Sequence, residues 1–321
     1  MEALVFIDTN ILLDFYRGVG REGGLAILDH LDGNHHRIIT GSQVEMEFKK
    51  HRQRVIIDAY RSLVVPDKGR LALPAFLAES KQAGAISKNQ AKLQDLLKTL
   101  KERTSRILNR PQQYDIVYRC TQRLFRSDSP HNLSRNKKER LQIRRQAWKR
   151  FILGYPPRKA DDTSLGDAIN WEWMVSCARS ASKELVIVSR DSDYGVSFDR
   201  LHQVNDWLAQ EFRERVSKKR KVTLTDRLTE GLKAAGIKVT KKEEQEEARL
   251  LDELPARPTS PGSSSIGHFD MESYVESVMG AGYSARLKEF TRLVTEANRV
   301  LLEAKAPEPK KTESEDGATD D

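Results

Sequence analysis

Short, wholly apolar runs alternate with longer amphipathic segments along the chain, and this order predicts strands that alternate with helices. Apolar runs at 3–7 (ALVFI), 37–39 (RII) and 184–188 (ELVIV) have the composition of buried strands. Helical patterns begin near Ser42 and cover 166–181. Strands that are apolar on both faces and alternate with helices are typical of a parallel sheet covered by helices. We therefore predict an α/β fold with a central parallel sheet.

The middle of the chain, about 66–160, has a different character and is predicted to be a large helical insertion. It is polar, and its clearest pattern is a helical spacing of leucines at Leu93, Leu96, Leu97 and Leu100. Because the strand patterns lie on both sides of this segment, one domain over 1–216 contains the insertion.

The remainder, after about 216, is predicted to add C-terminal helices outside that domain. We expect a charged helical extension at 217–254 and a flexible linker rich in Pro, Ser and Gly at 255–269. An amphipathic helix at 270–306, which could bind a protein partner, and a disordered acidic tail at 307–321 complete the prediction.

Charge is distributed unevenly along the chain, and this distribution says more about possible partners than the total charge does. The net charge is +8, but residues 81–150 hold 19 Lys or Arg against 5 Asp or Glu, a local +14 that leaves −6 for the rest. We interpret this segment as a nucleic-acid-binding arm in which Arg144, Arg145, Lys149 and Arg150 contact phosphates, and Phe125, Trp148 and Phe151 stack on bases. The alternative is a solvated helix face whose aromatic residues pack inward.

Other features of composition bear on the compartment. The chain has two cysteines, no apolar stretch near the roughly 18 residues of a membrane span, and an N-terminus without a basic signal region. We expect a cytoplasmic protein with no membrane association.

Acidic residues follow two of the predicted strands. Asp8 comes directly after the first strand, and Asp191 and Asp193 follow 184–188. Because ligands bind outside the carboxyl ends of parallel strands, these acids are expected to share one edge of the sheet. Arg190, beside them, could contact a phosphate or pair with an acid, and the sequence leaves both open.

Two helix acids could join this edge. Ser42 and Glu45 have the spacing of a capping box, which gives Glu45 a structural role, so we favour Glu47 beside the apolar face of that helix. Asp167 opens the 166–181 helix, and Asn170 follows it by one turn. Gathered carboxylates repel one another, and Mg²⁺ or Mn²⁺ would relieve that repulsion. Such ions support phosphodiester hydrolysis.

The quoted motifs resemble the PIN-domain superfamily, and more narrowly its bacterial branch with a large helical insertion. The resemblance rests on FIDTNILLD, QVEMEF, GDAINWEWM and VSRDSDYG, in that order. It implies a three-layer fold and a metal site. The acids that it assigns to the site are Asp8, Glu47, Asp167 and Asp191, with Asp193 as an auxiliary and Thr9, Asn10 and Asn170 in support.

The function implied by the resemblance is a metal-dependent endonuclease, with RNA favoured over DNA. Two alternatives stay open. One is a toxin or defence effector nuclease controlled by a partner, and the other is a catalytically silent nucleic-acid-binding scaffold.

Overall fold

The computed structural model describes residues 2–17, 25–63, 75–157, 164–198 and 201–253. The expected linker, the 270–306 helix and the acidic tail lie outside these residues. The N-terminal 257 residues form one compact unit.

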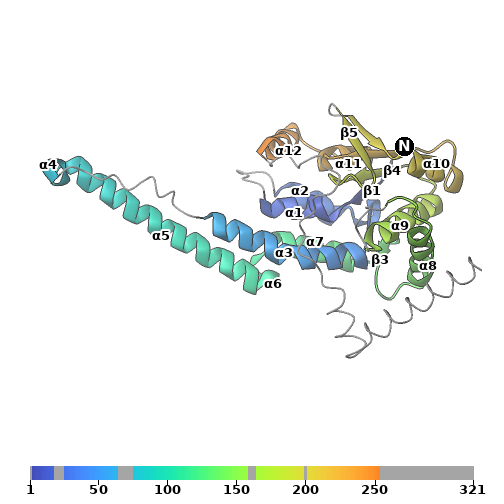
Figure 1. Ribbon diagram of the computed structural model, residues 1–321, viewed down its shortest axis with the longest axis horizontal. Coiled ribbons are helices and arrows are strands. Elements are labelled where there is room, and N and C mark those ends of the chain that lie inside the picture. Colours follow the sequence, from blue (N-terminus) through green and yellow to red (C-terminus); the bar gives the residue numbers. More distant parts are fainter. Residues whose placement is uncertain (1, 18–24, 64–74, 158–163, 199–200, 254–321) are drawn as a thin grey trace, which may run out of the picture. The chain divides into compact units, whose positions relative to one another are not determined.

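A five-stranded parallel sheet lies at the centre of this unit, with helices on both faces in a three-layer α/β arrangement (Figure 1). Its order is β3-β2-β1-β4-β7. The strands are β1 (Leu4–Ile7), β2 (Ile38–Gly41), β3 (Asn132–Leu133), β4 (Leu185–Val188) and β7 (Val222–Thr225). β1, β2 and β4 are buried on both faces, as their unbroken apolar composition predicts.

The sequence prediction is confirmed for the parallel sheet and its first strands. β1 pairs in register with β2 on one side, Phe6 opposite Ile39, and with β4 on the other, Phe6 opposite Ile187. Helix α11 (Leu228–Ala234) covers one face through Gly231, because a Cβ there would lie 2.5 Å from Val188. A larger residue at 231 would therefore push α11 off β4.

The segment after 216 differs from its prediction. Residues 222–225, expected in a helical extension, form β7, which pairs with β4 and completes the sheet. The strand was missed because VTLT is short and its first two residues are not fully buried, so the pattern is weak. After α11, helix α12 (Lys241–Glu253) packs on it through Glu247, which accepts a 3.0 Å hydrogen bond from the Thr229 amide.

The expected insertion is mostly helical, and parts of it belong to the core. Its described helices are α4 (Ala75–Ala78), α5 (Lys81–Asn109), α6 (Pro111–Tyr114), α7 (Ile116–Arg126) and α8 (Glu139–Ile152). α7 buries Leu124 and Phe125 in the core, and β3 pairs with β2. Arg52 of α3 (Ser42–Ser62) anchors this region, since its Nε lies 2.9 Å from Asp115 Oδ2 in a buried ion pair.

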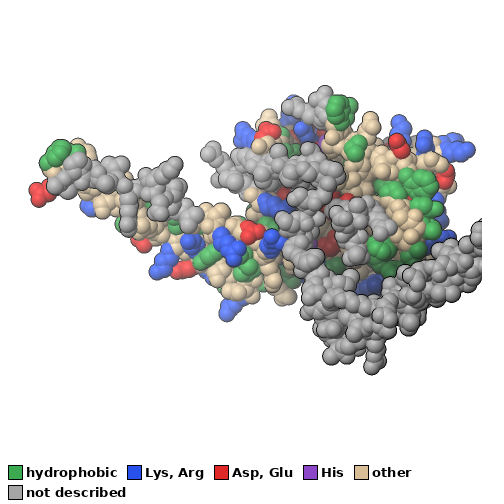
Figure 2. All heavy atoms as spheres, in the orientation of Figure 1, with side chains coloured by type: hydrophobic (Ala, Val, Ile, Leu, Met, Phe, Trp, Pro, Cys, Tyr) green, Lys and Arg blue, Asp and Glu red, His purple; other side chains and the backbone are tan. Residues whose placement is uncertain are grey.

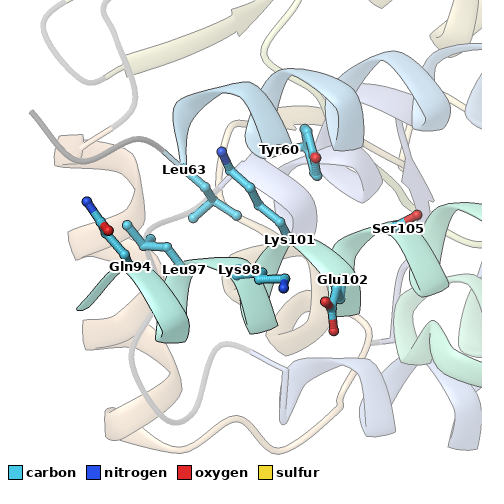
Figure 3. A pocket seen from close by; sticks show the side chains of 8 residues that line it. All are labelled: Tyr60, Leu63, Gln94, Leu97, Lys98, Lys101, Glu102 and Ser105. Carbon is cyan, nitrogen blue, oxygen red and sulfur yellow. The ribbon is translucent and has the colours of Figure 1, made fainter. Parts of the chain in front are cut away.

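Helix α5 is largely exposed, since Ala83 is its one buried position. Charged and apolar side chains alternate along its surface (Figure 2). Together with α3 it lines an open pocket of about 500 Å³ (Figure 3). The lining residues are Tyr60, Leu63, Gln94, Leu97, Lys98, Lys101, Glu102 and Ser105. None of the acids predicted for the site is among them.

The remaining described elements surround the sheet. They are α1 (Thr9–Arg17), α2 (Ile27–Gly33), the 3₁₀ turn His35–Arg37, α3 (Ser42–Ser62), α9 (Gly166–Ala181), the antiparallel ribbon β5 (Gly195–Phe198) and β6 (Leu201–Val204), and α10 (Asp206–Arg215). The predicted capping box of α3 is absent, because Glu45 accepts a hydrogen bond from Lys49 Nζ at 2.6 Å instead. No described helix is both long and apolar enough to cross a membrane.

Candidate active site

The candidate site lies where the sheet changes its winding direction. From β1 the chain proceeds to β2 and β3 on one side, and then returns to add β4 and β7 on the other. Asp8 follows β1, and Asp191 lies three residues beyond β4. Because β1 and β4 are parallel neighbours, both acids lie at the same edge, at the point where ligands bind in such sheets.

Asp8 is buried, and three donors hold its carboxylate. Its Oδ1 accepts the Thr9 amide at 2.6 Å, and its Oδ2 accepts Asn10 Nδ2 at 2.8 Å and Ser189 Oγ at 2.5 Å. Burial, followed by the nearby charge of Asp191 and then of Glu47, raises the pKa of Asp8 to about 7, although the bonds from Ser189 and Thr9 act in the opposite direction. The acids of β1, α3 and the β4 loop are thus close enough to repel one another.

Glu47 is held on α3 at the same place. Its Oε2 accepts the Thr9 hydroxyl at 3.1 Å, and its Oε1 accepts Gln43 Nε2 at 2.6 Å. The first turn of α9 approaches it closely, since a Cβ at Gly166 would lie 2.5 Å from Glu47 Oε1. Glycine at 166 therefore allows α9, and Asp167 with it, to pack against the Glu47 carboxylate.

The other predicted acids meet around Tyr194, which is fully buried and packs edge-on against Phe6 at 6.1 Å between ring centroids. Its pKa is raised well above the usual value, first by burial and then by the charges of Asp167, Asp8, Glu47 and Asp193. Asp167, Asp191 and Asp193 are half-buried. The five acids predicted from the sequence therefore converge on one region.

The donor set fits a hard divalent cation in its chemistry. The converging groups are oxygen donors, and their mutual repulsion is the condition that a cation relieves. The site also holds buried polar atoms without a hydrogen-bond partner among the described residues: Asn10 Oδ1, Asn170 Nδ2 and the Tyr194 hydroxyl. Within the described ranges, however, no three His, Cys, Asp or Glu side chains are placed closely enough together to hold a metal ion between them.

The residues expected to bind nucleic acid fall into two groups. Arg144, Arg145 and Lys149 are exposed on α8 and have no ion pair within the described part of the chain. The expectation for Arg150 does not hold, because its buried guanidinium is bound by Glu172 and Glu211. Arg190 pairs with Asp14 of α1, which is one of the two roles that the sequence left open.

One other expectation changes with the structure, and one is met. Phe125, which was expected to stack on bases, is buried against Phe48 in the core. Thr9, expected to support Asp8 through hydrogen bonds, does so with its backbone amide, and its hydroxyl donates to Glu47 as well. Phe48 and Glu47 are distant in sequence from Phe125 and Thr9, so no local pattern indicated these two contacts.

Sequence reasoning missed three residues of the site: Gln43, Ser189 and Tyr194. Ser189 and Tyr194 lie in VSRDSDYG, the segment that carries Asp191. Gln43 precedes Glu47 by four residues, and residues at this spacing share one face of a helix. That helical spacing was the signal that could have identified Gln43.

The PIN domain family model matches residues 5–194. The chain belongs to the PIN domain family. The match covers more than half of the chain and includes all five acids of the candidate site. PIN domains are generally nucleases that use divalent metal ions, and the family suggests nucleic-acid binding. No curated protein and no solved structure matches the chain.

Proposed function

We propose that this PIN domain is a Mg²⁺- or Mn²⁺-dependent endonuclease that hydrolyses phosphodiester bonds in RNA. The observation that carries the proposal is the meeting of acids from β1, α3 and the loop after β4 at one edge of the sheet, where Asp191 and Glu47 help to raise the pKa of Asp8. Clustered acids with perturbed pKa values at a ligand-binding edge indicate a functional site.

Asp8, Glu47, Asp167 and Asp191 would hold the metal, with Asp193 assisting. When bound, a divalent ion lowers the pKa of water and neutralises charge that develops on a phosphate. The chain's own contribution is orientation. Asn10 and Ser189 fix one oxygen of Asp8, and Gln43 and Thr9 fix both oxygens of Glu47.

RNA is proposed as the substrate because the family acts on it most often, and the exposed cations of α8 suit a polyanion. Arg144, Arg145 and Lys149 are the residues of this chain that we propose to contact phosphates.

Cleavage of labelled single-stranded RNA and matching DNA, with Mg²⁺, Mn²⁺ or EDTA, tests the proposal. Helix α3 offers a matched pair of variants. Glu47→Gln alters the site. Glu45→Gln removes the same charge two residues earlier on the helix, from a carboxylate that pairs with Lys49. We expect metal-dependent cleavage that Glu47→Gln abolishes and Glu45→Gln preserves.

Cleavage that survives in EDTA, or in the Glu47→Gln variant, would contradict the assignment. Cleavage of DNA alone would keep the site and replace the substrate. Binding of RNA without cleavage under any of these metals would favour the silent scaffold.

A further inference from the structure

Two aromatic pairs, each with at least one exposed ring, lie in the second half of α8 and just after it. Trp148, 54% exposed, stacks on Phe151 with 6.2 Å between ring centroids and an interplanar angle of 22°. Tyr155 and Trp207, 39% and 48% exposed, lie with their ring centroids 5.1 Å apart. Apolar side chains that are exposed singly need no explanation, but exposed aromatic rings that lie together mark candidate interaction sites.

The turn after α8 fixes the second pair. Gly154 adopts a positive φ of 72°, and the Tyr155 amide donates to the Arg150 carbonyl at 3.1 Å, so the helix ends in a Schellman-type turn. The buried Arg150 guanidinium also donates to the Pro156 carbonyl. Tyr155 is therefore held in position before any ligand arrives.

Trp207 is connected to the acidic site through the backbone. The Asn205 amide donates to the Tyr194 carbonyl at 2.9 Å, and the Asn205 side chain caps α10 by accepting the Trp207 amide at 3.0 Å. Two residues of chain span at most about 7 Å. The Tyr155–Trp207 pair thus lies near Tyr194, around which the acids converge.

Positive charge accompanies the aromatic side chains. Arg144 and Arg145 lie one helical turn before Trp148, and Lys149 follows it directly. All three are exposed and form no ion pair with the described residues, and Glu139 is the one acid of α8. An anionic partner with flat apolar groups matches this combination.

We propose that Trp148, Phe151, Tyr155 and Trp207, with Arg144, Arg145 and Lys149, form a platform for unpaired bases of a single-stranded nucleic acid. The inference rests on the proposed function and deepens it. The aromatic rings stack on bases while the cations contact the adjoining phosphates. Bases in a duplex are already stacked and paired, so the platform selects single-stranded substrate next to the acidic site.

Intrinsic fluorescence provides a direct test, because the chain has four tryptophans. Trp171 and Trp173 are buried, so quenching by an added ligand comes from Trp148 and Trp207. The measurement is a titration of the full chain in EDTA with a single-stranded oligonucleotide, a duplex of equal length and inorganic polyphosphate.

We expect saturable quenching by the single strand and much weaker binding of the duplex. By fluorescence polarisation of a labelled oligonucleotide, Trp148→Ala and Trp207→Ala each weaken binding about tenfold, as the loss of one stacked base predicts. Trp207→Phe retains most of the affinity. Phe76→Ala is the matched control, since Phe76 is an 83% exposed aromatic residue on α4, and it leaves binding unchanged.

Three results would overturn the platform: equal affinity for the duplex, equal quenching by polyphosphate, or unchanged affinity in both tryptophan variants. A dimer that Trp148→Ala converts to a monomer, without oligonucleotide quenching, would make the surface a contact between copies of this chain. Because binding is measured without metal, these results are separate from the Glu47→Gln cleavage test. Loss of quenching with intact cleavage rejects the platform alone, and quenching without cleavage rejects the proposed function.

Discussion

Helix α9 carries two acids, five residues apart, in opposite electrostatic surroundings. Glu172 is buried, and it accepts Arg150 Nε at 2.9 Å and Arg215 at 2.6 Å. Asp167, in the first turn, belongs with Asp8, Glu47 and Asp193 to the acids that surround Tyr194. One helix thus connects a cluster in which acids form ion pairs with arginines to a region in which acids lie close to other acids.

The pKa values reflect this difference. Burial opposes ionisation of Glu211 in the arginine cluster, yet hydrogen bonds and charge from Arg150 and Arg215 lower its pKa overall. At Asp8, burial and the neighbouring Asp191 and Glu47 raise the pKa instead. Acids that stabilise the fold have cations from the chain itself, whereas we propose that those of the site bind a cation from outside.

The largest effect is expected from breaking the arginine cluster. Glu172→Gln removes one of the two carboxylates that bind the buried Arg150, and loss of a buried ion-pair partner costs about 3–5 kcal/mol of the free energy of unfolding. Urea unfolding measures this loss. Glu244→Gln, which breaks an exposed pair with Lys233, costs at most about 1 kcal/mol. Equal losses in the two variants would show that the buried cluster has no special role in stability.

Asp8→Asn tests the acidic region, where we expect a large loss of activity with little loss of stability. The cleavage rate falls by more than about 100-fold, because even residues that only support metal ligands contribute about 10–100-fold. Stability changes little, since the variant removes a charge that Asp191 and Glu47 repel but also one of the two oxygens that accept hydrogen bonds. Asp58→Asn, at an exposed position of α3, serves as the control. A variant that unfolded easily would assign Asp8 a structural role instead.

A change of pH is expected to have a smaller effect on stability, and the sign of that effect identifies Asp8 as the titrating group. The folded pKa of about 7 lies above the unfolded value near 3.8, so the native state retains a proton that the unfolded chain has lost. Stability from this group is therefore complete below about pH 4 and is lost as pH rises towards 7. Between pH 5 and 7 we expect a loss of about 2 kcal/mol by urea unfolding, relative to the Asp8→Asn variant.

Saturating Mn²⁺ serves as the check on this pH dependence, because a bound cation displaces the proton and flattens the profile. An identical pH profile in wild type and Asp8→Asn, measured without metal, would contradict the raised pKa.

The sequence predicted those parts of the fold and site that depend on local patterns. β1, β2 and β4 are short runs of buried apolar residues, and the acids that follow β1 and β4 reach one edge because parallel strands share a direction. Glu47 was separated from Glu45 by its position on a helical face. These inferences needed no knowledge of distant partners.

The rest depended on contacts between distant segments. Arg150 has the same local sequence character as Arg145, yet Glu172 and Glu211 bury it, 22 and 61 residues further along the chain. Strand β3 has two residues, too few for a periodic pattern, and its pairing with β2 defines it. Tyr194 lies at the site because of its packing on Phe6, which no spacing in the sequence predicts.

The smallest expected effect comes from Tyr194→Phe, and it separates the acidic region from the arginine cluster most directly. The Tyr194 hydroxyl is fully buried and has no hydrogen-bond partner among the described residues, although Asp167, Asp8 and Glu47 all lie near it. A buried, unsatisfied polar group costs about 1–3 kcal/mol, so Tyr194→Phe should stabilise the metal-free protein by about 1 kcal/mol in urea unfolding.

Mn²⁺ binding then separates two roles for the hydroxyl. If the hydroxyl only fills space, the variant binds Mn²⁺ as tightly as the wild type. If instead it orients the acids around a bound ion, calorimetric titration would show weaker Mn²⁺ binding in the variant despite its greater stability. Lower stability in the variant would mean that the hydroxyl already has a partner in the folded protein, and that this region resembles the arginine cluster more than the acid pKa values indicate.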